Sequence, residues 1–111
     1  PKLKAPANAC DCHMHIYDPA RFPMPPSQRV APMNAAVPQY RLLQQRIGTS
    51  RVIVVQPRNY AIDNRVTLDA LKQFAPNVRG VFRRSASTAS GTSRSTTLRV
   101  TSIEIVSPFS T

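Results

Sequence analysis

The segment TSRVIVVQP at residues 49–57 decides the fold class of this chain. From Val52 to Val55 every residue is apolar and β-branched, and Pro57 then stops the run because proline removes a ladder donor. A continuous β-branched run is typical of a strand that is covered on both faces, as in parallel sheets. The segment therefore predicts a buried parallel strand over residues 51–55.

Upstream of this strand the sequence predicts a helix. Pro38 suits the first helical turn, and Gly48 suits the position just past a helix end. Between them an apolar stripe recurs at spacings of three and four residues, so residues 38–47 are predicted to form an amphipathic helix. The stripe consists of Tyr40, Leu43 and Ile47.

Further upstream lie a short strand and a long connection. The segment ACDCHMHI at residues 9–16 indicates a strand, whereas residues 17–37 contain five prolines and are predicted to be a loop. A loop of this length without regular structure is usually functional or disordered.

Downstream, the pattern predicts one more helix and one more strand. Asp63 or Asn64 can cap a helix that ends before Pro76, and residues 78–82 then indicate a short strand. The predicted apolar face of the helix is Leu68, Leu71, Phe74 and Ala75. The order is therefore βαβαβ up to about residue 83, an α/β pattern that favours a parallel sheet with right-handed crossovers.

After residue 83 the composition changes. Residues 85–111 hold eight Ser and six Thr, and the βαβ rhythm stops. Residues 101–106 are expected to make at most one isolated strand. We therefore divide the chain into residues 1–83 and an irregular, divergent Ser/Thr-rich tail at residues 84–111. A low-complexity tail is one explanation; our preferred hypothesis is a frameshift product, because a frame slip in GC-rich coding sequence yields Ser, Arg, Thr and Ala.

The charge of the chain invites a nucleic-acid interpretation. The 111 residues hold 15 Lys and Arg against 5 Asp and Glu, giving a formal charge of +10. However, the cations are scattered singly except at Arg83-Arg84, and the spacing matches no nucleic-acid-binding module. Nucleic acid is therefore not the expected partner. The alternative kept open is a small, non-catalytic, basic βαβ protein that binds anions or nucleic acid.

Several classes of protein are excluded or disfavoured. No apolar run approaches the roughly 20 residues that a membrane-spanning helix needs, so no membrane association is expected. Residues 1–111 show no charged-then-apolar segment, so secretion is not the expectation. Cys10 and Cys12 are too close in the sequence for a disulfide between them to stabilise the fold. A cytoplasmic location is the expectation that follows.

A cluster of site-like residues closes the first predicted strand. Strict alternation would place Asp11, His13 and His15 on one face of that strand. Two imidazoles about 7 Å apart along one face can converge on one ion, and neutral imidazole suits zinc, manganese or iron. A mixed Cys/His metal site is disfavoured because the cysteines would lie on the opposite face, and buried cysteines with hydrogen-bonded histidines remain an open alternative. The opposite, apolar face would hold Cys10, Cys12, Met14 and Ile16.

Several segments, in order and at matching spacing, carry a resemblance to a known family. They are DCHMHIYDP at 11–19, FPMPP at 22–26, YRLLQQRIG at 40–48, TSRVIVVQP at 49–57, DNRVTLDAL at 63–71 and VRGV at 78–81. Over residues 2–83 the chain resembles the amidohydrolase-related proteins of the amidohydrolase superfamily, in the branch that contains 2-pyrone-4,6-dicarboxylate lactonase.

The resemblance implies a fold and a set of site residues. The fold would be the N-terminal βαβαβ portion of a (β/α)8 TIM barrel, incomplete at three of eight strands, with the site at the carboxyl ends of the strands. His13 and His15 would be metal ligands for one divalent ion, zinc or manganese, or would contact the substrate carbonyl in members that work without metal. Gln56, Asn59 and Tyr60 would bind substrate. The general base, an Asp on the last strand of the family barrel, is absent from this chain.

The implied function is hydrolysis of a cyclic ester or amide such as a lactone, including carboxylated substrates, with or without the help of a metal. Arg58 and Ala61 depart from the family pattern, which often has Ser and Gly there. As an isolated, truncated chain the protein is expected to be weakly active or inactive, because two histidines without the base do not complete a site. The exposed edge of an incomplete sheet would favour self-association.

Overall fold

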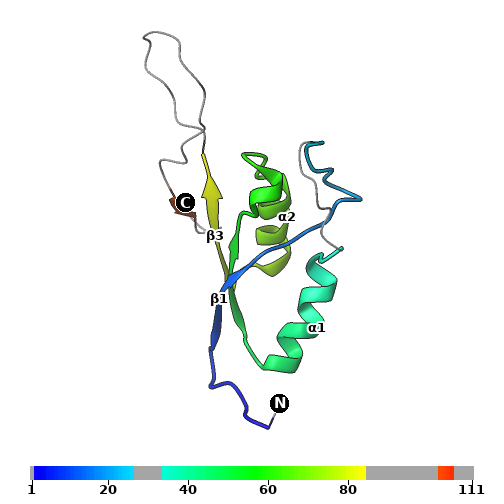
Figure 1. Cartoon of the computed structure of the whole chain (residues 1–111). Coiled ribbons are helices and arrows are strands. Elements are labelled where there is room, and N and C mark those ends of the chain that lie inside the picture. Colours follow the sequence, from blue (N-terminus) through cyan, green and yellow to red (C-terminus); the bar gives the residue numbers. More distant parts are fainter. Residues whose placement is uncertain (1, 27–33, 85–102, 107–111) are drawn as a thin grey trace.

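A computed structural model of the chain describes residues 2–26 and 34–84, together with the backbone of residues 103–106. Within these residues the predicted βαβαβ order is confirmed (Figure 1). The elements are β1 (Cys10–Met14), α1 (Val37–Ile47), β2 (Arg51–Val55), the 3-10 turn η1 (Arg58–Tyr60), α2 (Arg65–Phe74), β3 (Val78–Arg83) and β4 (Ile103–Val106).

The strands form one sheet in the order β1-β2-β3-β4, and the first three strands run parallel. Val52 pairs with Val78 and Val54 with Gly80, so β2 and β3 are in register along their length. Both α1 and α2 lie on the same side of the sheet (Figure 1). The α/β prediction with parallel strands and helical crossovers is thus confirmed.

The core lies between the sheet and the two helices. Val52 and Val54 are 2% and 0% exposed, as expected for a strand covered by helices. A methyl group added at Gly80 would lie 2.9 Å from Cδ1 of Leu71 and 2.9 Å from Cε2 of Phe82, so the glycine leaves room for the side chain of Leu71 against β3. The other buried apolar residues include Met14, Ile16, Val37, Tyr40, Tyr60, Val66, Ala70, Phe74 and Val78.

The predicted apolar faces of the helices are partly confirmed. Tyr40 of α1 and Leu71 and Phe74 of α2 are buried, but Leu43 and Leu68 are 48% and 47% exposed. The two helices also contact each other, with the ring centroids of Tyr40 and Phe74 5.5 Å apart. At the start of α2, the Asp63 carboxylate accepts the Arg65 N–H at 3.2 Å.

Part of the tail joins the sheet. The expectation of an isolated strand is wrong, because β4 pairs antiparallel with β3, with Phe82 opposite Glu104 and Arg83 opposite Ile103. The backbone groups along the outer edge of β3 find partners in this way. The remaining residues of the tail lie outside the described residues, so the proposed boundary between residues 83 and 84 and the frameshift origin stay predictions.

No helix in the described part of the chain is long and apolar enough to cross a membrane.

Candidate active site at the carboxyl ends of the strands

A bulge in β1 sets the direction of the side chains at the site. Asp11 pairs with Val52 and Met14 with Val54, so three steps along β1 match two steps along β2. Strict alternation is therefore broken between Asp11 and Met14, a common feature of strands next to active sites. Because both partners on β2 are buried under the helices, Asp11 and Met14 share the helix side of the sheet.

The carboxylate of Asp11 is held by α1 and by the bulge itself. Its Oδ2 accepts the hydroxyl hydrogen of Tyr40 at 2.8 Å, and its Oδ1 accepts the backbone N–H of His13 at 3.2 Å. Burial, followed by the hydrogen bond to Asp11, raises the pKa of Tyr40, so this phenol stays a donor. Asp11 thus lies beside His13 and His15, with which it lines one cavity, and it also contacts α1.

The two cysteines are less buried than the apolar face of the first strand predicts. Cys10 is half-buried and Cys12 is exposed, whereas Met14 and Ile16 are buried as expected. Burial, together with the neighbouring Cys12 thiol, raises the pKa of Cys10. The buried-cysteine alternative is therefore wrong for Cys12.

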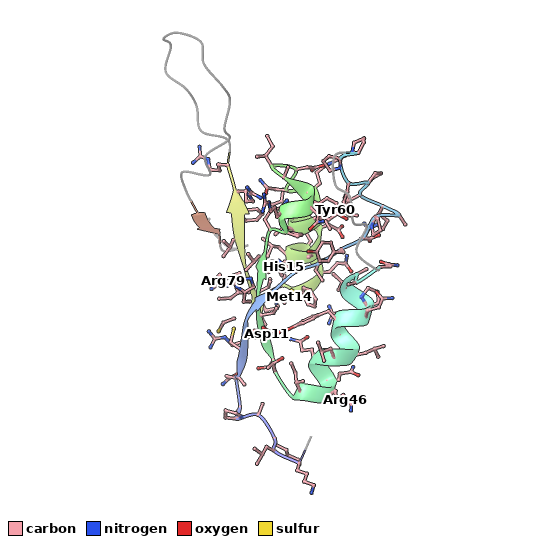
Figure 2. All side chains as sticks on the ribbon, in the orientation of Figure 1. Asp11, Met14, His15, Arg46, Tyr60 and Arg79 are labelled. Carbon is pink, nitrogen blue, oxygen red and sulfur yellow. The ribbon has the colours of Figure 1, made fainter. Side chains whose placement is uncertain are left out.

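The two histidines lie together at the end of β1. Their ring centroids are 5.1 Å apart and the rings are nearly perpendicular, at 85°. Both residues are exposed, and Figure 2 shows His15 just beyond Met14. Nδ1 of His15 lies 2.8 Å from the carbonyl oxygen of Val55, the last residue of β2. Since a carbonyl only accepts, Nδ1 carries the hydrogen and the lone pair sits on Nε2.

A row of rings leads from the histidines into the core. The centroid of His15 is 6.2 Å from that of Tyr17, and Tyr17 is 6.3 Å from Tyr60, which is fully buried. The Tyr17 hydroxyl donates to Oδ1 of Asn59 at 3.4 Å, joining the loop after β1 to η1. Tyr17 was not among the predicted site residues, although its position two residues after His15 is a usable signal.

The three predicted substrate contacts have different surroundings. Asn59 is half-buried and contacts Tyr17 near the histidines. Gln56 is 4% exposed; its Nε2 donates to the carbonyl oxygen of Asp63 at 2.7 Å, and its Oε1 accepts the hydroxyl of Thr67. Both polar ends of Gln56 are thus used inside the protein.

Tyr60 also has an internal partner. Its hydroxyl oxygen accepts the backbone N–H of Asp18 at 3.1 Å, and burial raises its pKa. The structure therefore brings Asn59 to the histidine end of the sheet, with Tyr60 and Gln56 packed beneath. Substrate binding by Gln56, Asn59 and Tyr60 stays a prediction.

The loop after β1 is tied to α2 by an ion pair that the sequence did not reveal. Arg21 donates two hydrogen bonds to the carboxylate of Asp69, at 2.9 and 3.0 Å, and lies 3.5 Å from Asp18. The hydrogen bonds from Arg21 hold the pKa of Asp69 below its usual value. These contacts fix the segment that follows the histidines.

A cavity of about 420 Å³ opens beside the histidines, between β1 and α1. It is lined by Asp11, His13, Met14, His15, Ala35, Gln39, Tyr40 and Leu43.

The donor set fits part of a metal site. Two imidazoles at this separation suit two positions on a zinc or manganese ion, and the carbonyl contact orients His15 as carbonyls and carboxylates orient metal-binding histidines. Catalytic zinc has three protein ligands, however. Among the described residues no group of three or more His, Cys, Asp or Glu is arranged to hold an ion. Metal binding by His13 and His15 stays a prediction, in which they would supply two ligands of a larger set.

Comparison with known proteins agrees with this geometry. A model of the amidohydrolase family matches residues 10–89. The chain is 37% identical over 92 residues to a 2-pyrone-4,6-dicarboxylate hydrolase of Comamonas testosteroni, covering 80% of the chain and 30% of the relative. It is 32% identical over 79 residues to a 4-sulfomuconolactone hydrolase of Rhizobium radiobacter, covering 70% of the chain and 26% of the relative.

Solved structures show the same fold. A protein of Agrobacterium tumefaciens in its apo form superposes with a TM-score of 0.69 at 30% identity, covering 80% of this chain and 33% of that one. A probable 2-pyrone-4,6-dicarboxylic acid hydrolase of Acinetobacter baumannii, with citric acid bound, gives a TM-score of 0.65 at 22% identity, covering 74% and 31%. The neighbours are TIM-barrel amidohydrolases, and the chain spans about a third of their length. By the family match over residues 10–89, this chain belongs to the amidohydrolase family.

Proposed function

We propose that this chain carries the first part of a hydrolase that opens a cyclic ester or amide, such as a lactone. The observation that carries the proposal is the pair of perpendicular imidazoles of His13 and His15, with His15 anchored to Val55. The names of the two relatives, both hydrolases and one of a lactone, support the substrate class. Both names also describe anionic substrates, which supports a carboxylated or similarly charged ring.

The roles of the residues follow from their positions. His13 and His15 would hold one zinc or manganese ion, which supplies polarisation of the substrate carbonyl when bound. If no metal is used, His13 and His15 would contact that carbonyl directly. Asn59 is the candidate substrate contact. Gln56 and Tyr60 act beneath the site as positioning residues, because their polar atoms are paired inside the protein.

We further propose that this chain alone turns over little or no substrate. Asp11 is the described carboxylate beside the histidines and is already held by Tyr40, so among the described residues no free carboxylate is placed to take a proton from water. Two free thiols suit a reducing compartment, which supports a cytoplasmic location. Self-association through the outer edge of β1, which no described strand covers, belongs to the same proposal.

A metal titration read by NMR tests the histidine pair. The chain has two histidines, so His13→Ala and His15→Ala assign both imidazole signals without ambiguity. We expect Zn²⁺ or Mn²⁺ to perturb both signals together, and each substitution to weaken binding roughly tenfold or more. Cys12→Ser is the matched control, because Cys12 is exposed beside His13 and should leave the affinity unchanged.

Two results would count against the proposal. Loss of metal binding in Cys12→Ser would assign the metal to the thiol rather than to the imidazoles. If the imidazole signals respond neither to metal nor to a lactone, the two histidines form no binding site. Sequencing the gene through codons 80–120 tests the frameshift hypothesis separately: a βα pattern that resumes in another frame supports it, and its absence from both other frames defeats it.

A further inference from the structure

A second cavity, of about 210 Å³, lies at the opposite end of the sheet from the histidines. Its lining includes Cys10, Arg51 and Val78, which are the first residues of β1, β2 and β3, together with Arg79. It is therefore a separate feature at the amino ends of the parallel strands, and what it binds does not depend on the proposed hydrolase activity.

The sheet register places two guanidinium groups over this cavity. Val52 and Val78 are buried under the helices and pair with each other. Because side chains alternate along a strand, Arg51 and Arg79 emerge on the other face, from neighbouring strands. Figure 2 shows Arg79 on the side of the sheet away from α1 and α2. Nη1 of Arg79 donates to the carbonyl oxygen of Val78 at 2.8 Å, which fixes its guanidinium at the cavity.

No described carboxylate neutralises these two cations. The cavity lining contains no Asp or Glu, and among the described residues no ion pair involves Arg51 or Arg79. Every described carboxylate has another partner: Asp11 contacts Tyr40, Asp18 and Asp69 contact Arg21, and Asp63 contacts Arg65. Two unpaired guanidinium groups on one cavity repel each other, and an anion between them removes that repulsion.

We propose that this cavity binds a small phosphate-type oxyanion between Arg51 and Arg79. Guanidinium groups match the oxygen spacing of phosphate and form paired, charge-assisted hydrogen bonds with it. Asn77, which also lines the cavity, offers an amide at its rim. Two of the scattered cations of the chain would thus form one defined anion site.

The two cysteines provide an internal readout. Cys10 lines the cavity and Cys12 does not. A bound oxyanion covers the Cys10 thiol, and it also neutralises Arg51, whose charge lowers the pKa of Cys10 against the larger effect of burial. Both effects slow alkylation of Cys10, whereas alkylation of exposed Cys12 should keep its rate.

The test is a titration of the full chain with inorganic phosphate at constant ionic strength, followed by thermal unfolding and by the alkylation rate of each cysteine. We expect saturable stabilisation, as for a ligand that binds the folded state. Arg51→Gln and Arg79→Gln should each weaken phosphate binding about tenfold, the usual value of a charge-assisted hydrogen bond. Arg46→Gln is the matched control, since it removes the same charge from the exposed end of α1 (Figure 2).

Three outcomes would overturn the proposal. In the first, Arg46→Gln weakens phosphate binding as much as Arg51→Gln, which indicates diffuse attraction. In the second, phosphate slows alkylation of both cysteines equally or of neither. In the third, a short oligonucleotide binds while inorganic phosphate does not, which assigns the charge to nucleic acid. Should Arg51→Gln fail to fold, Arg51→Lys and Arg79→Gln answer the same question, the lysine keeping the charge but losing the paired donors.

Discussion

The hydroxyl oxygen of Tyr60 accepts the backbone N–H of Asp18 at 3.1 Å, and both residues are buried. Tyr60 ends the 3-10 turn after β2, and Asp18 lies in the loop after β1. This one bond therefore holds the segment that follows the histidines against the end of the neighbouring strand. Because His15 contacts Val55 on the same strand, the two contacts fix the loop on both sides of Tyr17.

Replacing Tyr60 with Phe removes this acceptor while keeping the ring. The N–H of Asp18 is then buried without its partner, which costs about 1–3 kcal/mol. Urea unfolding measures the loss, and the NMR signal of His15 should shift more than that of His13. Tyr17→Phe is the comparison, because it removes the longer 3.4 Å bond of a half-buried residue and should cost less. Equal effects on stability and on both imidazoles would contradict the positioning role.

Replacing Thr67 with Val leaves the Oε1 of Gln56 without a donor. Both residues are buried, so we expect a loss of about 1–3 kcal/mol in the free energy of unfolding. Thr67→Ser keeps the hydroxyl and should lose less. Adding Gln56→Met to Thr67→Val also removes the donor to the carbonyl oxygen of Asp63, so the double variant should be no more stable than Thr67→Val. Chemical denaturation of the four proteins checks this; equal stability of the Val and Ser variants would contradict it.

Stability should fall in acid through Asp69. Arg21 lowers the pKa of Asp69 in the folded state, so the pair contributes fully above the unfolded pKa of about 3.9 and the contribution is lost as the pH falls through the folded value. Urea midpoints measured from about pH 5 to about pH 2 should decrease. The urea midpoint of the Asp69→Asn variant should decrease less over the same pH range. A wild-type curve parallel to that of Asp69→Asn would show that the pair makes no contribution.

Replacing Gly48 with Ala should destabilise the chain by about 1 kcal/mol. Gly48 ends α1 with φ 79°, a left-handed conformation that side chains rarely adopt. Its N–H donates to the carbonyl oxygen of Gln44 at 2.9 Å, so the conformation closes the last turn of the helix. Gly48→Asn should cost less than Ala, since Asn tolerates this region better. Thermal unfolding distinguishes the two variants. A Gly48→Ala variant as stable as wild type would show that the left-handed conformation imposes no strain on a side chain.

Local patterns in the sequence were sufficient to predict the order and most bounds of β1 to β3 and the two helices. The β-branched run of β2 and the Pro38–Gly48 frame of α1 are read from neighbouring residues, and the structure confirms both. The bulge in β1 could not be predicted in this way, because it is defined against β2, some forty residues away. Pairing of β4 with β3 is likewise a contact between distant segments.

The candidate site could also be predicted only where it depends on neighbouring residues. The HxH spacing brought His13 and His15 together as expected, since it depends on residues that are neighbours in the sequence. The surroundings of Gln56 depend on which face of β2 the helices cover. Because every residue of Val52–Val55 is apolar, the sequence does not show which face the helices cover. In the structure Val52 and Val54 are buried under the helices, and alternation places Gln56 on the same side. Asn59 and Tyr17 meet only because two loops end at one edge of the sheet.

The antiparallel pairing of β4 has a consequence for growth of the sheet. A particle with two open edges can add copies at both ends and lengthen without limit, which is how filaments begin. In the described part of the chain, β4 covers the outer edge of β3, so β1 and β4 are the two outer strands of the sheet. Neither of them has a further partner among the described strands. Edge-to-edge association of copies would then extend along one line instead of stopping at a closed pair.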